Sequence, residues 1–293
     1  MKKIIIAGGT GFIGTYLTMR FTEMGYKVYI ISRTSGNISW ENNAIVDALE
    51  GAELVINLAG KSIQCRHTNI NKKSILESRI ESTTLIGDAI LSCKKPPKLW
   101  INASGTSIYK QSNVKKMTED ETDLGTDFLA EVVVQWENAL FNFQTPTTRQ
   151  VALRTSVVIG KNGGALQPLV WLTRFGLGGK QGDGNQILSW IHIEDYFKIL
   201  LFLFKNQNIN GVINCTSPNP VSNKEFMTSL QNTLRIPLGI PAPKFAIKLV
   251  SKILGIESDL ILNSSFTEPK RLLEAGYKFH FPLIDKALVN LLK

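Results

Sequence analysis

The sequence predicts an α/β protein: a doubly wound parallel sheet, with a smaller and mainly helical part at the C-terminal end. Two observations carry this prediction. Strand-like and helix-like segments alternate as far as about residue 220, which is the pattern of parallel strands joined by helical crossovers. Beyond that point, strand signals give way to helix-like segments and prolines.

The opening residues, MKKIIIAGGTGFIG, indicate the first strand and helix. The apolar run 4–7 is typical of a buried parallel strand, and apolar residues recur at helical spacing from Tyr16 onward. Gly8 can make the tight turn out of the strand, Gly11 lets backbone approach a phosphate, and Gly14 lets the helix pack closely on the strand. Free N–H groups at the start of a helix suit an anion.

We therefore predict that this loop holds the pyrophosphate of a dinucleotide. The expected contacts are Gly8, Thr10, Gly11, Phe12, Ile13 and Gly14.

The second strand is predicted over 27–32, and the residue that follows it indicates which dinucleotide is bound. An Asp or Glu there binds the ribose hydroxyls of NAD, whereas an Arg accommodates the 2′-phosphate of NADP. The chain reads Ser32-Arg33, so we expect NADP (NADPH), with both residues as contacts. The alternative is that Arg33 is one more surface cation in a chain with 33 Lys and Arg.

Further segments continue the alternation. The remaining strand candidates are 53–58, 99–103, 149–159 and 211–214, and the helix candidates are 71–91 and 126–143. After residue 220, helices are predicted over 222–234, 244–254, 258–265 and 268–275. In a doubly wound sheet, ligands bind at the carboxyl ends of the strands, so the turns after Ala7, Leu58, Ala103 and Ile159 are candidate walls of a site.

Composition narrows the classes of protein and ligand. The chain is 43% hydrophobic and 19% charged, as expected of a globular protein with a substantial core. Its three cysteines are scattered without metal-ligand spacing, which favours free thiols, a reducing cytoplasmic compartment and no metal site. The opening apolar run is too short for a signal peptide, and no apolar run is long enough to span a bilayer.

The net charge of +9 is dispersed, without a basic stripe interleaved with aromatic residues. It favours solvated surface cations with some attraction for phosphorylated ligands over binding of nucleic acid.

Four motifs resemble those of the extended short-chain dehydrogenase/reductases, the epimerase and dehydratase group. They are Gly8–Gly14, Asn57–Gly60, Arg154–Gly160 and Trp190–Asp195. The resemblance implies an NADP-binding Rossmann domain over residues 1–220, with 161–190 contributing to the substrate side. It also implies further cofactor contacts at Leu58, Ala59 and Gly60.

A narrower resemblance is to a branch called the epimerase family, relatives of a protein described as a cell-division inhibitor. It rests on Ser78-Arg79, Trp136-Glu137, Gly163–Leu166 and the segment 269–276, PKRLLEAG. That branch carries a short C-terminal domain, which would be residues 244–293 here.

The pair Tyr-x-x-x-Lys that the superfamily normally uses is missing from the expected helix. Its i, i+4 spacing places both side chains on one helix face, where the Tyr moves a proton and the Lys holds the nicotinamide ribose. If Glu137 takes the place of the acidic residue that commonly follows the pair, the two positions fall at Leu129 and Val133. Neither side chain can do that chemistry, so the resemblance implies an atypical member.

Three other residues are candidates for catalysis: Ser104, Tyr109 and Glu131. Ser104 follows the strand that in this family delivers the catalytic Ser or Thr, so it could hold a substrate oxygen. Tyr109 could be a substitute acid, or a packed aromatic with its hydroxyl satisfied. Glu131 lies on the helix that lacks the pair and could be an acid or a base, or a surface residue.

Five further polar residues can each be interpreted in two ways. His192, between two isoleucines, is more typical of a hydrogen-bonded core residue than of a catalyst, and Asp195 could pair with it or cap the next helix. Arg154 could bind an anionic substrate or brace a loop. Arg66 and Arg79 could face the cleft or be solvated cations.

The sequence therefore predicts an NADP(H)-binding, atypical reductase or epimerase-like enzyme acting on a small polar substrate, with a homodimer as one possible assembly. The rival hypothesis is a catalytically silent nucleotide-binding regulator or scaffold, for which the resemblance suggests a link to cell division. Binding of the cofactor does not decide between them, because a fold does not imply a function.

Overall fold

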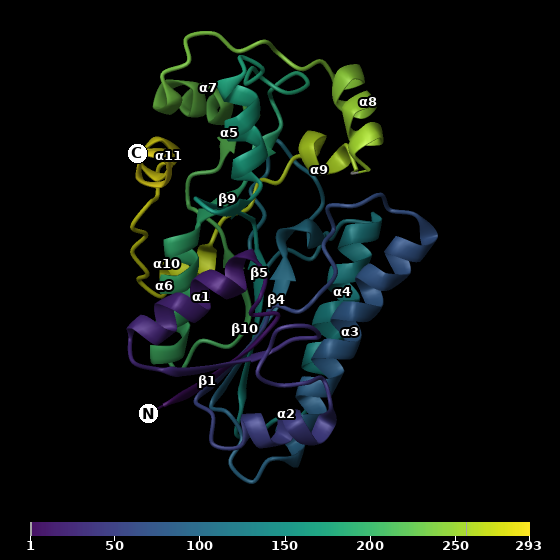
Figure 1. Ribbon diagram of the computed structural model, residues 1–293, viewed down its shortest axis with the longest axis vertical. Coiled ribbons are helices and arrows are strands. Elements are labelled where there is room, and N and C mark those ends of the chain that lie inside the picture. The colour runs from purple at the N-terminus through teal and green to yellow at the C-terminus, as the bar shows by residue number, and fades with distance from the viewer. Residues whose placement is uncertain (1, 256) are drawn as a thin grey trace.

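The computed structural model describes residues 2–255 and 257–293, and its centre is a six-stranded sheet (Figure 1). In spatial order the strands are β2 (Lys27–Ile31), β1 (Lys3–Ala7), β3 (Leu54–Asn57), β4 (Leu99–Gly105), β5 (Arg149–Thr155) and β10 (Gly211–Cys215). Every neighbouring pair is parallel. The order reverses between β1 and β3, so the predicted doubly wound sheet is confirmed and its switch point lies beside the glycine loop.

Helices cover both faces of the sheet because successive residues of a buried strand point to opposite sides. Ile4 and Ile6 pack with one set of helices, and Ile5 packs with the other. The first face carries α1 (Phe12–Glu23) and α6 (Ile193–Lys205). The second carries α2 (Asn42–Leu49), α3 (Asn69–Ser92) and α4 (Phe128–Phe141), and Figure 1 shows the sheet between the two layers.

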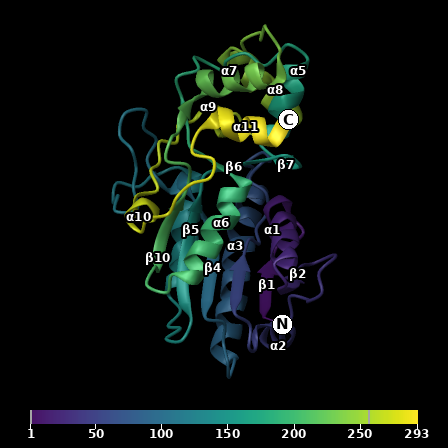
Figure 2. The ribbon, with the colours of Figure 1, turned by 90° about the vertical axis from the view of Figure 1, so that its left-hand side faces the viewer.

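A mostly helical part lies over the carboxyl ends of the strands in both views (Figures 1 and 2). Its helices are α5 (Leu166–Arg174), α7 (Asn223–Leu234), α8 (Lys244–Leu254), α9 (Asp259–Leu262) and α11 (Ile284–Leu292). Its short strands are β6 (Val157–Gly160), β7 (Gly163–Gly164), β8 (Ile187–Leu188), β9 (Trp190–His192) and β11 (Val221–Ser222), and α10 (Lys270–Glu274) lies beside β10.

Two predicted elements end earlier in the structure because residues near their ends bond to distant parts of the chain. The strand predicted over 149–159 is two strands, because the chain leaves the central sheet at Ser156, whose N–H and hydroxyl both donate to the Cys215 carbonyl. β6 then pairs with β9 instead. The helix predicted over 258–265 is only α9, because Ser264 and Ser265 bond to the backbone of Ile187.

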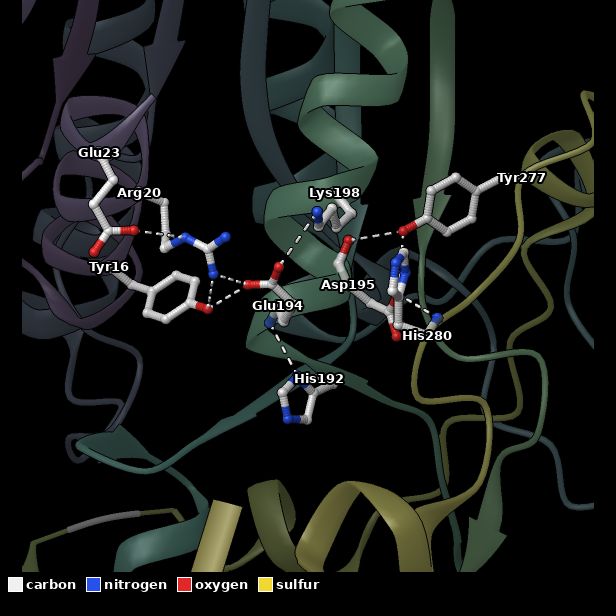
Figure 3. Close-up of polar contacts among 9 residues, drawn as sticks. All are labelled: Tyr16, Arg20, Glu23, His192, Glu194, Asp195, Lys198, Tyr277 and His280. Carbon is white, nitrogen blue, oxygen red and sulfur yellow. Dashed lines mark hydrogen bonds and ion pairs between the residues drawn. The ribbon is translucent and has the colours of Figure 1, made fainter. Parts of the chain in front are cut away.

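Asp195 fastens the C-terminal segment to α6 (Figure 3). Its buried carboxylate accepts hydrogen bonds from the Tyr277 hydroxyl at 3.1 Å and from the N–H groups of His280 and Phe281 at 2.9 and 2.8 Å. The expectation that Asp195 pairs with His192 or caps α6 is wrong, because the C-terminal segment fills its acceptor positions. Buried polar contacts of Asp195 therefore hold α6 and the segment 277–281 together.

His192 is the core residue that its apolar neighbours indicate. It caps α6 itself, since its Nδ1 accepts a hydrogen bond from the Glu194 N–H at 3.0 Å. Its ring stacks on Phe281 with centroids 4.0 Å apart. Burial lowers the pKa of His192 to about 4, which keeps the ring neutral.

Within residues 2–255 and 257–293, no helix combines the length and apolar character needed to cross a membrane.

Candidate functional site

The glycine loop between β1 and α1 is built for close approach of backbone. Gly8 has φ +75, and a Cβ there would lie 2.9 Å from the Ala59 nitrogen, so the loop touches the end of β3 directly. A Cβ on Gly14 would lie 2.5 Å from the Gly8 carbonyl oxygen, so that glycine lets α1 pack on the loop. A Cβ on Gly11 would meet only the Gly8 oxygen, at 3.6 Å. The space over Gly11 is therefore open to a ligand.

The start of α1 fits an anion. No side chain caps it, and its first turn carries no acidic residue. The N–H groups of Phe12, Ile13 and Gly14 have no acceptor within the helix, because the first intrahelical bond runs from the Thr15 N–H to the Gly11 carbonyl. These donors and the positive end of the helix dipole suit the pyrophosphate of a dinucleotide.

The remaining predicted cofactor residues lie at the same edge of the sheet. Ser32 and Arg33 follow β2, and Arg33 is exposed. Leu58, Ala59 and Gly60 follow β3, where the Asn57 side chain accepts from the Ala59 N–H at 3.1 Å and shapes the turn. All three predicted groups thus flank the switch point, where a doubly wound sheet binds its ligand.

The helix expected to carry the catalytic pair presents apolar side chains instead. α4 begins at Phe128, with Asp127 capping the N–H groups of Leu129 and Ala130. Val133 is buried with Ile108, Tyr109 and Met117. This face of the helix is therefore packed against the segment that follows β4.

Two of the three catalytic candidates belong to one buried hydrogen-bond network. The Ser104 hydroxyl donates to Glu137 at 2.5 Å. Arg154 binds both carboxylate oxygens of Glu137, at 2.8 and 2.7 Å, and donates to the Tyr109 hydroxyl at 2.8 Å. The Tyr109 hydroxyl in turn donates to Asn214 at 2.7 Å. The network thus links the ends of β4, β5 and β10 to α4.

The electrostatics of this network favour the charged Arg154 and the neutral Tyr109. Its carboxylate partner Glu137 raises the pKa of Arg154 against the effect of burial, so the guanidinium stays charged. Burial raises the pKa of Tyr109 to about 12, opposed by Arg154. The usual tyrosine of the superfamily has its pKa lowered by a lysine, so Tyr109 is in the opposite situation.

The third catalytic candidate lies apart from the other two. Glu131 is exposed in the first turn of α4, and in the described part of the chain its carboxylate makes no hydrogen bond to Ser104 or Tyr109. Arg154 braces the interior through its pairing with Glu137.

In the sequence, Glu137 served to align the helix and as part of the Trp136-Glu137 motif, but neither Glu137 nor Asn214 was predicted as a site residue. The available signal was the position of Glu137 next to Trp136, on the face of α4 that is buried, where a glutamate needs a partner.

The sequence matches two families. Residues 4–216 match the NAD dependent epimerase/dehydratase family. Residues 242–291 match a domain of unknown function, DUF1731.

Curated relatives and solved structures match nearly the whole chain. The epimerase family protein YfhF of Bacillus subtilis is 36% identical, over 99% of this chain and 98% of its own. The human epimerase family protein SDR39U1 is 34% identical, over 98% of both chains. The crystal structure of human SDR39U1 (isoform 2) with NADPH superimposes with a TM-score of 0.91 at 33% identity, covering 99% of this chain and 98% of that one.

Proposed function

The chain belongs to the NAD dependent epimerase/dehydratase family, the extended short-chain dehydrogenase/reductases, and from that premise we propose that it binds NADP(H) and acts on a small polar substrate without a Tyr-x-x-x-Lys pair. The observation that carries the proposal is the edge formed by the glycine loop, the start of α1 and Arg33. When bound, the cofactor supplies or accepts a hydride. The chain's own residues would bind and orient the substrate and move the proton.

The cofactor preference rests on Arg33 and on the neighbour solved with NADPH. Arg33 is exposed two residues after the end of β2, and neither Ser32 nor Arg33 is the Asp or Glu that would bind ribose hydroxyls. A planar guanidinium suits a 2′-phosphate, because it donates two parallel hydrogen bonds. Human SDR39U1, solved with NADPH, supports the same preference, although other structures of this fold were solved with NAD.

Substitution of Arg33 tests this preference. Arg33→Asp should weaken NADPH binding by about tenfold or more, the size expected for losing a hydrogen bond to a charged group, and should affect NADH far less. Dissociation constants from fluorescence titration measure both. Lys94→Asp is the control, because Lys94 is exposed beyond α3 and carries the same charge change. Equal losses for NADPH and NADH would remove the argument for a 2′-phosphate site.

We propose that separate regions of the chain bind the cofactor and the substrate. Residues 1–220 form the Rossmann domain, residues 161–190 contribute to the substrate side, and residues 244–293 form a small C-terminal domain. The loop after β4 joins the Rossmann domain to the C-terminal domain: Met117 forms a β-bridge with Thr267, and Asp120 pairs with Lys270 at 2.5 Å.

For catalysis we propose Ser104, Tyr109 and Glu131 as the residues to test. The Ser104 hydroxyl directs its proton to Glu137, and its oxygen can accept a hydrogen bond from a substrate hydroxyl. Tyr109 can yield a proton only if the bond that it donates to Asn214 breaks, whereas the bond that it accepts from Arg154 can persist. Glu131 is exposed and is the one carboxylate among the three.

One observation favours the rival function, a nucleotide-binding regulator or scaffold: the protons of both Ser104 and Tyr109 are committed to partners inside the protein. Turnover distinguishes the two functions. Purified protein with NADPH should be assayed on a panel of carbonyl compounds and nucleotide sugars, together with Tyr109→Phe, Ser104→Ala and Glu131→Gln. Turnover that one of these variants abolishes supports the enzyme, whereas tight NADPH binding with no turnover across the panel favours the regulator.

A further inference from the structure

Lys61 follows β3, and Lys72 and Arg79 lie on α3; the contacts of these three cations are neutral, unlike those of cations that pair with carboxylates. Arg154 pairs with Glu137, and Arg20 with Glu194. By contrast, the Lys61 ammonium donates to the Asn71 side-chain oxygen at 2.7 Å, and the Lys72 ammonium lies 5.0 Å from the Phe128 ring centroid. Within residues 2–255 and 257–293, no carboxylate lies within 4.0 Å of either ammonium, so this segment carries positive charge without local neutralisation.

Arg79 of α3 is the most constrained of these cations. Its Nη1 donates to the carbonyl oxygens of Lys61 and Ile75, at 3.0 and 2.8 Å. Its guanidinium stacks on the Trp136 ring, 5.0 Å from the centroid, and the Trp136 indole is itself held by a hydrogen bond to Thr83 at 3.0 Å. The guanidinium is therefore fixed in place by neutral partners.

No acidic group in the described part of the chain lies within ion-pair distance of Arg79. Burial lowers the pKa of Arg79 to about 10, and no opposite charge acts against it. A cation taken partly out of water without a counter-charge is unfavourable, and a bound anion would relieve that cost. The side chain still keeps some solvent exposure, which leaves donors for a ligand.

Arg79 lies at the carboxyl ends of the strands, beside the switch point, where a doubly wound sheet has its ligand crevice. A Cβ on Gly60 would lie 3.2 Å from the Arg79 Cζ, so the guanidinium lies directly against the end of the predicted cofactor segment. On its other side is Trp136 of α4, one turn from Val133, the position where the usual lysine is missing. The fixed cation is therefore next to both the cofactor segment and the helix that should carry the chemistry.

We propose that Arg79 is an anion-binding residue of this crevice, which receives a carboxylate or phosphate group of a bound ligand. The anion can belong to the second ligand, the substrate, or to NADP(H) itself. Arg79 offers the paired N–H donors that planar anions favour. The proposal rests on the proposed function in one respect, which is that the crevice binds NADP(H).

The test compares Arg79→Gln with Lys73→Gln, an exposed residue of the same helix whose change removes the same charge. Two measurements are made: the NADPH dissociation constant, and the shift in Tm that inorganic phosphate or citrate gives to protein saturated with NADPH. If the cofactor supplies the anion, Arg79→Gln weakens NADPH binding by about tenfold or more. If the second ligand supplies it, NADPH binding is unchanged and the anion-induced Tm shift of the wild type is lost.

The proposal is overturned if Arg79→Gln behaves as Lys73→Gln in both measurements. Far-UV circular dichroism checks folding. If Arg79→Gln does not fold, Arg79→Lys carries the test, because it keeps the charge but not the paired donors, and it should show the same loss in smaller measure. A wild-type protein that fails to bind NADPH would contradict the proposed function instead, so the two failures are distinguishable.

Discussion

Removal of the Glu137 carboxylate should destabilise the protein more than the removal of an exposed carboxylate does. Glu137 and Arg154 are 7% and 6% exposed, and they share two hydrogen bonds, at 2.8 and 2.7 Å. Glu137→Leu leaves the buried Arg154 guanidinium, within the described residues, with a hydrogen bond to the Tyr109 hydroxyl alone, and it removes the acceptor of Ser104. Breaking a buried ion pair in this way costs about 3–5 kcal/mol.

The pair itself should contribute much less than that loss suggests. Exchanging both partners for apolar side chains of similar volume is often close to neutral, because no charge is left without a partner. Arg154→Met, added to Glu137→Leu, should therefore recover most of the lost stability. A double-mutant cycle isolates this coupling between the two residues.

Urea unfolding of the two single variants and the double variant measures the free energy of unfolding, with circular dichroism as the signal. Glu131→Gln is the control, because Glu131 is an exposed carboxylate in the first turn of the same helix, and its loss should cost at most about 1 kcal/mol. The reasoning fails if Glu137→Leu costs no more than this control. It also fails if the two single losses simply add in the double variant.

Two further predictions concern the glycine loop and the pH dependence of stability. Gly11→Ala should keep the wild-type Tm, because its Cβ meets only the Gly8 oxygen at 3.6 Å, but it should weaken NADPH binding by about tenfold or more. Gly14→Ala should lower the Tm, because its Cβ would lie 2.5 Å from that oxygen. A Tm that falls in Gly11→Ala but not in Gly14→Ala would contradict the geometry. Burial lowers the pKa of His192 from 6.5 to about 4, so the stability it contributes is full above pH 6.5 and is lost as the pH falls toward 4, by up to about 3 kcal/mol. His192→Asn, which keeps a capping acceptor, should flatten the fall in urea midpoint over this range, and parallel curves would show that His192 is not responsible.

The parts of the fold that the sequence predicted depend on nearby residues. The strand, turn and helix around Gly8, Gly11 and Gly14 follow one another directly, so apolar runs and glycine positions were enough to place them. The parallel, doubly wound character of the sheet followed from the same alternation of strands and helices. The candidate cofactor residues come together because each follows a parallel strand at the same edge.

The parts that the sequence did not predict depend on contacts between distant residues. Ser156 ends β5 because its N–H and hydroxyl bond to Cys215, 59 residues away. Asp195 is explained only by its bonds to Tyr277 and the residues after it, 82 or more positions later. The partner of Arg154 depends on the register of α4 against β5, which places Glu137 beneath the strand end. No local pattern carries such information.

A crystal structure of the NADPH complex tests the central claim most directly. We predict that the pyrophosphate lies over Gly11, within hydrogen-bond distance of the Phe12 and Ile13 N–H groups, and that the 2′-phosphate lies within hydrogen-bond distance of the Arg33 guanidinium. A dinucleotide bound away from the switch point between β1 and β3, or a 2′-phosphate directed into solvent away from Arg33, would contradict the account.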